Sequence, residues 1–240
     1  MTCTRGFTVQ HYQDTINRFL DSGYHIGPVS DYFQNKIYNK HILLRHDVDF
    51  SLDYALDMAL LEKDLGVKAT YYILVRSSIY SSISDEGTKT IREIKRAGHE
   101  IGLHIDSRNY GGAIEFEILA RIAQQEIVQW SKHLYTITPD PKPVPEIGNV
   151  DIPLRQGGYQ YIADSAMSWR NGCMCLHREN KIQLLVHPAW WMAKPNGEAN
   201  RWEVLEILEA AANRKTAAAF MDFRMLLKER ELEVFECVNN

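Results

Sequence analysis

The sequence predicts an α/β protein built on a mainly parallel sheet. Short apolar segments rich in β-branched and aromatic residues alternate with segments whose apolar residues recur at helical spacing, as in repeated strand–helix units. Of the 240 residues, 45% are hydrophobic and 24% are charged, which is typical of a globular protein with one sizeable core. The alternation is compatible with a sheet closed into a barrel or with an open, doubly wound sheet.

The first half of the chain supplies three expected strands and two expected helices. An apolar strand over 41–48 leads into a helix that Ser51 can cap and Gly66 can end. The apolar stripe of that helix consists of Leu52, Leu56, Ala59 and Leu60. A strand over 67–75, a short helix over 88–97 closed by Gly98, and a strand over 99–105 follow.

The second half continues the same alternation. The expected elements are a long amphipathic helix over 113–133, strands over 134–138, 159–163 and 181–187, and helices over 200–212 and 215–227. Asn200 can cap the first of these last two helices, whose apolar positions are Trp202, Leu205, Leu208 and Ala212. The proline-rich segment 139–146 excludes helix and central strand and is expected to be an extended connection inside a single domain, 1–240.

Charge and hydropathy point to a small-molecule partner. The formal net charge of -4 is spread along the chain, so no basic footprint for nucleic acid or an anionic membrane is present. No run approaches the ~20 apolar residues of a membrane span, and the first residues lack the apolar core of a signal peptide. We therefore expect a cytoplasmic protein, and whether it forms a homo-oligomer stays open.

The four cysteines are too few and too unevenly spaced for a disulfide framework. They lie at Cys3, Cys173, Cys175 and Cys237 and are expected to be reduced. Cys173 and Cys175 form a Cys-x-Cys pair that could bind a soft metal ion. Because no second cysteine pair accompanies it, we favour packing in the core or a loop.

The first candidate functional motif is the charged end of the strand over 41–48. There Arg45, Asp47 and Asp49 alternate, so that they share one face of the strand. In α/β proteins, sites lie at the carboxyl ends of parallel strands, and two close carboxylates call for a cation. A helix-capping aspartate with a salt bridge to Arg45 explains one of these carboxylates but not both.

Two further strands end in histidines. His104 closes the strand over 99–105, whereas His99 faces the other way and is expected to be a hydrogen-bonded structural histidine. His187 follows an apolar strand and could donate a proton near neutral pH, although a histidine bonded at a turn is the alternative. Trp190 and Trp191 come next and fit stacking on a sugar ring about as well as core packing.

These motifs together resemble the polysaccharide deacetylase family, also called the NodB-homology or carbohydrate esterase 4 group. The resemblance spans most of the chain and is strongest in LLRHDVD, KATYYI and GHEIGLH, and it extends to LLVHP. It is closest to the branch with an Arg-His-Asp-Val-Asp first motif, which is linked to assembly of bacterial surface carbohydrates. The family fold, a distorted (β/α)7 barrel with mainly parallel strands, agrees with the alternation above.

The resemblance also assigns roles to individual residues. Asp47 corresponds to the general base, Asp49 and His104 to ligands of one divalent metal ion, expected to be zinc, and His187 to the general acid that Asp164 orients. We expect Arg45, Trp169, Trp190 and Trp191 to contact the substrate.

The family pattern is broken at one metal ligand, since Arg108 stands where a second histidine is usual. Asp106 is the candidate third ligand, because it would share a face with His104 if the strand continues; pairing with Arg108 in a loop is the alternative. The arginine of the family's third motif is not evident, and Arg155 is the candidate for it.

The resemblance implies a metal-dependent hydrolase that removes an acetyl or formyl group from the nitrogen of an amino sugar or sugar intermediate. The expected setting is surface polysaccharide biosynthesis, such as that of O-antigen or capsule. Two alternatives stay open: a sugar-binding or regulatory protein with attenuated catalysis, and a hydrolase of another C–N bond in a ureide or formamide.

Overall fold

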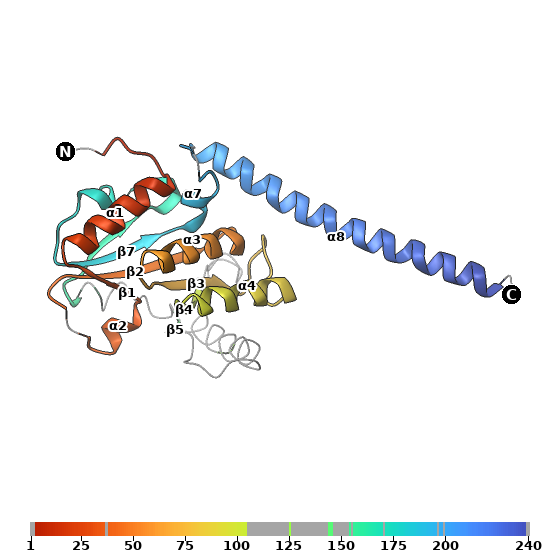
Figure 1. The fold of residues 1–240 in the computed structure, drawn as a ribbon, viewed down its shortest axis with the longest axis horizontal. Coiled ribbons are helices and arrows are strands. Elements are labelled where there is room, and N and C mark those ends of the chain that lie inside the picture. The colour runs from red at the N-terminus through yellow and green to blue at the C-terminus, as the bar shows by residue number, and fades with distance from the viewer. Residues whose placement is uncertain are drawn as a thin grey trace.

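The protein is a mixed α/β structure with a parallel sheet, as the sequence predicts (Figure 1). The computed structural model describes residues 3–36, 38–104, 125, 144–145, 154, 156–169, 171–195, 197–198 and 200–238. Its strands are β1 (His25–Gly27), β2 (His41–Val48), β3 (Thr70–Leu74), β4 (Glu100–His104), β5 (Val144–Pro145), β6 (Gln160–Ala163) and β7 (Lys181–Val186).

Strand β2 is central to the seven-stranded sheet, whose order is β5-β4-β3-β2-β7-β6 with β1 also paired to β2. Strand β7 runs along residues 41–46 of β2, and the other edge of β2 is shared by β1 at 41–43 and β3 at 45–48. All described pairings are parallel, so the carboxyl ends of β2, β4, β6 and β7 lie at one edge. Among the described residues β5 and β6 do not pair with each other, and closure into a barrel is not confirmed.

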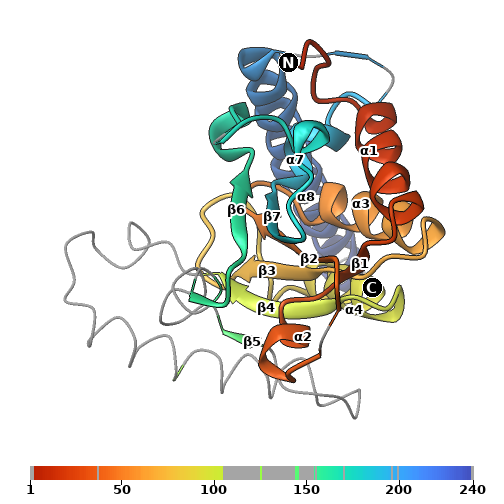
Figure 2. The same ribbon diagram turned by 90° about the vertical axis from the view of Figure 1, so that its left-hand side faces the viewer.

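Helices cover the sheet and begin at side-chain caps. They are α1 (Val9–Asp21), α2 (Ser30–Phe33), α3 (Leu52–Asp64), α4 (Asp85–Arg96), α7 (Pro188–Met192) and α8 (Arg201–Val238), with 3-10 turns η2 (Ser165–Met167) and η3 (Met174–Leu176). Thr8, Ser51 and Ser84 cap α1, α3 and α4 by accepting a backbone N–H of the first turn. Figures 1 and 2 show α1 and α3 on the same side of the sheet and α8 extending away from it.

The two faces of β2 have different surroundings. Ile42, Leu44 and Val48 belong to the main core, together with residues of α1, α3 and α4. Leu43 instead belongs to a second, smaller cluster with Val29, Tyr72, Leu154 and Tyr159. Because side chains alternate along a strand, Arg45 and Asp47 lie on the Leu43 face, away from the layer of α1 and α3.

The expected boundaries of α3 are confirmed, but its buried face differs from the predicted stripe. Ser51 caps the helix and Gly66 adopts φ +75° just after it. Leu60 is 46% exposed, whereas Glu62 is fully buried. The predicted apolar stripe is wrong at Leu60, because Glu62 takes a core position instead. Hydrogen-bond donors from other elements satisfy its carboxylate.

Several other expectations can be compared with the described chain. The expected helix over 113–133 and strand over 134–138 lie outside the described residues, as does most of the 139–146 segment. The two helices expected after Asn200 are one continuous helix, α8, with Asn200 Oδ1 accepting the N–H groups of Trp202 and Glu203. Helix α1 and strand β1 were not predicted. None of the described helices combines the length and apolarity that crossing a membrane requires.

Candidate active site

Four parallel strands deliver acidic and histidine side chains to one edge of the sheet. Asp47 lies in β2 and Asp49 just beyond it, His104 ends β4, Asp164 follows β6 and His187 follows β7. The structure therefore brings together five of the residues that the sequence singled out. This edge is where parallel α/β sheets carry their sites.

Asp49 and His104 form the most accessible part of this cluster. Asp49 Oδ1 lies 3.1 Å from His104 Nε2, and the side chains are 31% and 14% exposed. His187 Nε2 lies 3.8 Å from Asp49 Oδ2. A carboxylate and an imidazole are ligands that suit Zn²⁺ and related divalent ions. The part of the chain that the structure describes adds no third ligand to this pair, and Asp106, Arg108 and Arg155 lie outside it.

Asp47 is held by Arg45 in the interior of the sheet. Arg45 Nη2 donates to Asp47 Oδ1 at 2.6 Å, and its guanidinium lies 4.5 Å from the centre of the Tyr72 ring. Burial would raise the pKa of Asp47, but the charges of Arg45, His104 and His187 hold that pKa well below its ordinary value. Arg45 is only 2% exposed. Its guanidinium is buried against Asp47 and fixes that carboxylate, and contact of Arg45 with substrate stays a prediction.

His187 has the opposite arrangement, with a buried carboxylate behind it. Asp164 Oδ1 accepts from His187 Nδ1 at 2.6 Å, and Asp164 Oδ2 accepts from Trp191 Nε1 at 2.8 Å. Burial would lower the pKa of His187, but the charge and hydrogen bond of Asp164, with Asp47 and Asp49, raise it to about 9. Since Nδ1 is hydrogen-bonded to Asp164, Nε2 is the nitrogen that faces Asp49.

The three tryptophans do not form an open sugar platform. Trp191 is fully buried, packs against Phe7 and Tyr12, and its Nε1 donates to Asp164. Its contact with a sugar stays a prediction. Trp190 is 5% exposed and lies beside Phe50. Trp169 is half-buried, with one face stacked on Phe7. Within the described residues, Trp169 has the largest exposed fraction of the three.

A buried network behind β2 supports the site from the other face. Glu62 of α3 accepts hydrogen bonds from His46 Nε2 at 2.8 Å, from Tyr71 Oη at 2.7 Å and from Tyr12 Oη. His46 Nδ1 lies 3.2 Å from the carbonyl oxygen of Val186, the residue before His187. The network thus joins α1, α3, β2, β3 and β7. The only local sign in the sequence was an acidic residue at a helical position facing the core.

His99 has the structural role that was expected. It is buried, its Nε2 lies 2.9 Å from the Ala59 carbonyl oxygen, and its Nδ1 accepts the N–H of Ala69. Both ring nitrogens are thereby satisfied, away from the His104 side of the strand.

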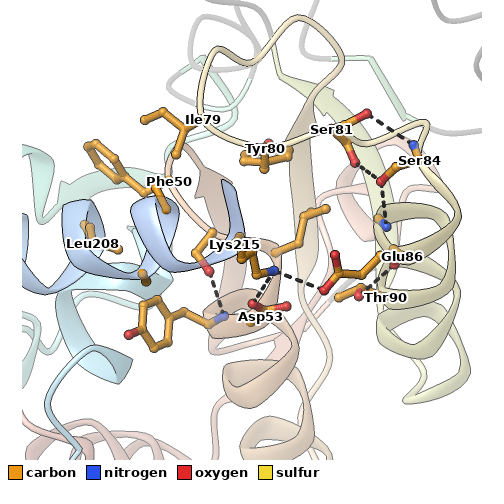
Figure 3. Close-up of a pocket in the computed structure, with 16 residues that line it drawn as sticks. Phe50, Asp53, Ile79, Tyr80, Ser81, Ser84, Glu86, Thr90, Leu208 and Lys215 are labelled. Atoms are coloured by element: carbon orange, nitrogen blue, oxygen red, sulfur yellow. Dashed lines mark hydrogen bonds and ion pairs between the residues drawn. The ribbon is translucent and has the colours of Figure 1, made fainter. Parts of the chain in front are cut away.

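A cavity of about 230 Å³ lies at the start of α3 (Figure 3). It is enclosed by the start of α3, the 79–87 segment and α8, and Lys215 bridges Asp53 and Glu86 across it at 2.8 and 3.2 Å. Phe50, next to Asp49 in the chain, lines it, but the acidic and histidine residues at the strand ends do not. The chemistry therefore belongs to the strand ends.

No protein-family profile matches the chain, and no curated protein matches it. Among solved structures, it is similar to a family 4 carbohydrate esterase from Bacillus anthracis, with 16% sequence identity and a TM-score of 0.39, over 88% of this chain and 89% of that chain. A likeness of this degree does not bear on which side chains act. The functional proposal therefore depends on the geometry at the strand ends.

Proposed function

We propose that the protein is a metal-dependent hydrolase that removes an N-acyl group, acetyl or formyl, from an amino sugar or a sugar intermediate. The observation that carries the proposal is the paired tuning of Asp47 and His187. Arg45 lies 2.6 Å from Asp47 and favours its ionised form, and Asp164 lies 2.6 Å from His187 and favours its protonated form. Two titratable groups whose pKa values are shifted in opposite directions in this way are suited to act as base and acid at one pH.

Asp49 and His104 are the proposed metal ligands, with Asp106 as the candidate third. Their donor atoms already converge at 3.1 Å, and their chemistry fits Zn²⁺ as well as harder divalent ions. A divalent ion bound there supplies Lewis-acid polarisation of the acyl oxygen and lowers the pKa of a water molecule.

The remaining steps are assigned to the chain's own side chains. Asp47, ionised and held by Arg45, accepts a proton from the attacking water. His187 gives its Nε2 proton to the departing nitrogen, while Asp164 holds Nδ1 and keeps the ring in place. The products are a free amine on the sugar and a short carboxylate. The ground for choosing a sugar, and surface polysaccharide biosynthesis as its setting, is the resemblance of the strand-end motifs to polysaccharide deacetylases.

Metal titration tests the ligand assignment. Wild type, Asp49→Ala and His104→Ala are titrated with Zn²⁺ by calorimetry, with Asp64→Ala, an exposed residue of α3, as the matched control. We expect each of the first two variants to lose one bound ion, or the affinity for it, relative to wild type, and Asp64→Ala to bind as wild type does. Unchanged stoichiometry and affinity in Asp49→Ala and His104→Ala would contradict the assignment.

A further inference from the structure

Three cysteines and one histidine converge at a second place, outside the cluster at the strand ends. Cys3 precedes α1, His11 lies in the first turn of α1, and Cys173 and Cys175 lie at η3 between β6 and β7. One ligand atom from each lies within 4.8 Å of the others. His11 Nε2 is 3.6 Å from Cys173 Sγ and 3.9 Å from Cys3 Sγ.

These spacings match the edges of a tetrahedral metal site. With Zn–S near 2.3 Å and Zn–N near 2.0–2.1 Å, a tetrahedron has S···N edges of about 3.6 Å and S···S edges of about 3.8 Å. Three thiolates and one imidazole form a ligand set that selects a soft or borderline ion such as Zn²⁺ over Mg²⁺ or Ca²⁺.

The histidine is oriented as a metal ligand would be. His11 Nδ1 lies 2.8 Å from the carbonyl oxygen of Gly6, which can only accept, so Nδ1 carries the hydrogen and Nε2 presents its lone pair to the sulfurs. His11 is fully buried.

The surroundings carry positive charge that suits a thiolate site. Three thiolates and a neutral imidazole around a dication leave a single net negative charge. Arg5 lies near Cys3, and Arg18 reaches the carbonyl oxygens of Met174 and His177 at 3.4 Å each, beside Cys175. The sulfurs are close enough to hydrogen-bond to one another as free thiols, but the structure pairs none of the three in a disulfide.

Another cluster of possible metal ligands, made of two histidines and a carboxylate, differs from the cysteine–histidine cluster. His25, Asp31 and His41 also converge, but Asp31 already has an ion-pair partner, because Lys36 Nζ lies 2.6 Å from its Oδ1. That cluster is explained as a salt bridge. Within the described part of the chain, by contrast, no ion pair involves Cys3, His11, Cys173 or Cys175, and His11 Nε2 faces the sulfurs of Cys173 and Cys3.

We propose that Cys3, His11, Cys173 and Cys175 form a closed structural binding site for Zn²⁺. Binding forms three Zn–S bonds and one Zn–N bond, and the three thiol protons pass to solvent. Four protein ligands leave no open position, so the ion is structural. It ties the segment before α1 to the connection between β6 and β7, which holds Asp164.

The site also braces the proposed general acid. The His11 ring lies 5.8 Å from the Trp191 ring, and Trp191 donates to Asp164, which holds His187. A fixed His11 therefore limits movement of the chain of contacts that ends at His187. The proposal itself does not depend on the function proposed for the strand ends.

Cobalt substitution of the full chain tests the site. Reduced protein reconstituted with Co²⁺ is expected to show thiolate-to-cobalt charge-transfer absorption and the intense visible bands of tetrahedral Co²⁺. Cys173→Ser and Cys175→Ser should lose this signature, whereas Cys237→Ser and the doubly substituted Asp49→Ala, His104→Ala protein should keep it. The last variant separates failure of this site from failure of the proposed function. Wild-type protein that takes up Co²⁺ without thiolate absorption would overturn the proposal.

A second measurement needs no variant. Cys3 and Cys175 are partly exposed, so they should be alkylated readily in the native protein if they are free thiols. The measurement uses the Zn²⁺-loaded protein. We expect their alkylation, followed by mass spectrometry, to be slow until a strong chelator is added, with Cys237 unaffected by the chelator. Equal rates with and without chelator, or a disulfide among the three cysteines, would contradict a zinc site.

Discussion

Asp164 is predicted to be the group that keeps His187 protonated, and Asp164→Asn removes its charge with little change of shape. The pKa of His187 is about 9, against an ordinary value of 6.5. At 1.36 kcal/mol per pH unit, this difference corresponds to roughly 3 kcal/mol in favour of the protonated form. Asp164 supplies the largest opposition to burial, so the variant's pKa should fall to near or below 6.5.

The assay is an NMR titration of the His187 ring in chelator-treated protein, from pH 5 to pH 10. Trp191→Phe is the matched control, because it removes one hydrogen bond to Asp164 but keeps the charge. Its His187 pKa should stay well above 6.5. An unchanged His187 pKa in Asp164→Asn would refute the assignment of the shift to Asp164.

The same shift has a consequence for stability. The folded-state pKa of His187 lies above its ordinary value, so protonated His187 stabilises the fold fully below pH 6.5, and this contribution is lost as the pH rises towards 9. The difference in unfolding free energy between wild type and Asp164→Asn should therefore shrink by roughly 3 kcal/mol between pH 6 and pH 9.5. A difference that grows with pH would contradict the sign.

Two further predictions concern the frame around the site. Glu62→Gln should lower the free energy of unfolding by roughly 3 kcal/mol in urea titrations, because a neutral amide accepts the buried hydrogen bonds of His46, Tyr71 and Tyr12 less well. Glu206→Gln, exposed on α8, is the control, and equal stability of the two variants would contradict the prediction. Ser51→Ala should cost about 1 kcal/mol by the same measurement, since Ser51 Oγ accepts the Tyr54 N–H at the start of α3, whereas Ser51→Thr should retain most of that stability.

The sequence predicts the convergence of acidic and histidine residues at the strand ends better than it predicts the buried network behind them. Apolar runs that end in Asp47, His104 and His187 mark strands and their carboxyl ends, and parallel pairing then brings those ends together. Local patterns carry this information. For Glu62 they show only an acidic residue at a helical position that faces the core. Its partners come from α1, β2 and β3, and a buried carboxylate without them would be unfavourable.

Long-range contacts also explain what was missed elsewhere. The sequence around Trp191 fits core packing and stacking on a sugar ring equally well. The hydrogen bond from Trp191 to Asp164, which the sequence does not reveal, favours the first of these roles. The Cys173 and Cys175 pair was set aside for lack of a second cysteine pair, but its companions, Cys3 and His11, are more than 160 residues away in the chain. Spacing along a sequence cannot reveal ligands that folding alone brings together.

The most direct test of the proposed chemistry is release of carboxylate by metal-replete protein from a panel of N-formyl and N-acetyl amino sugars, with ureides for comparison. Wild type should release formate or acetate from at least one amino sugar, and Asp47→Asn, with its bound metal content unchanged, should be slower by on the order of 10²–10⁴. Wild-type rates in metal-replete Asp47→Asn, or no carboxylate from any amino sugar with the wild type, would contradict the proposal.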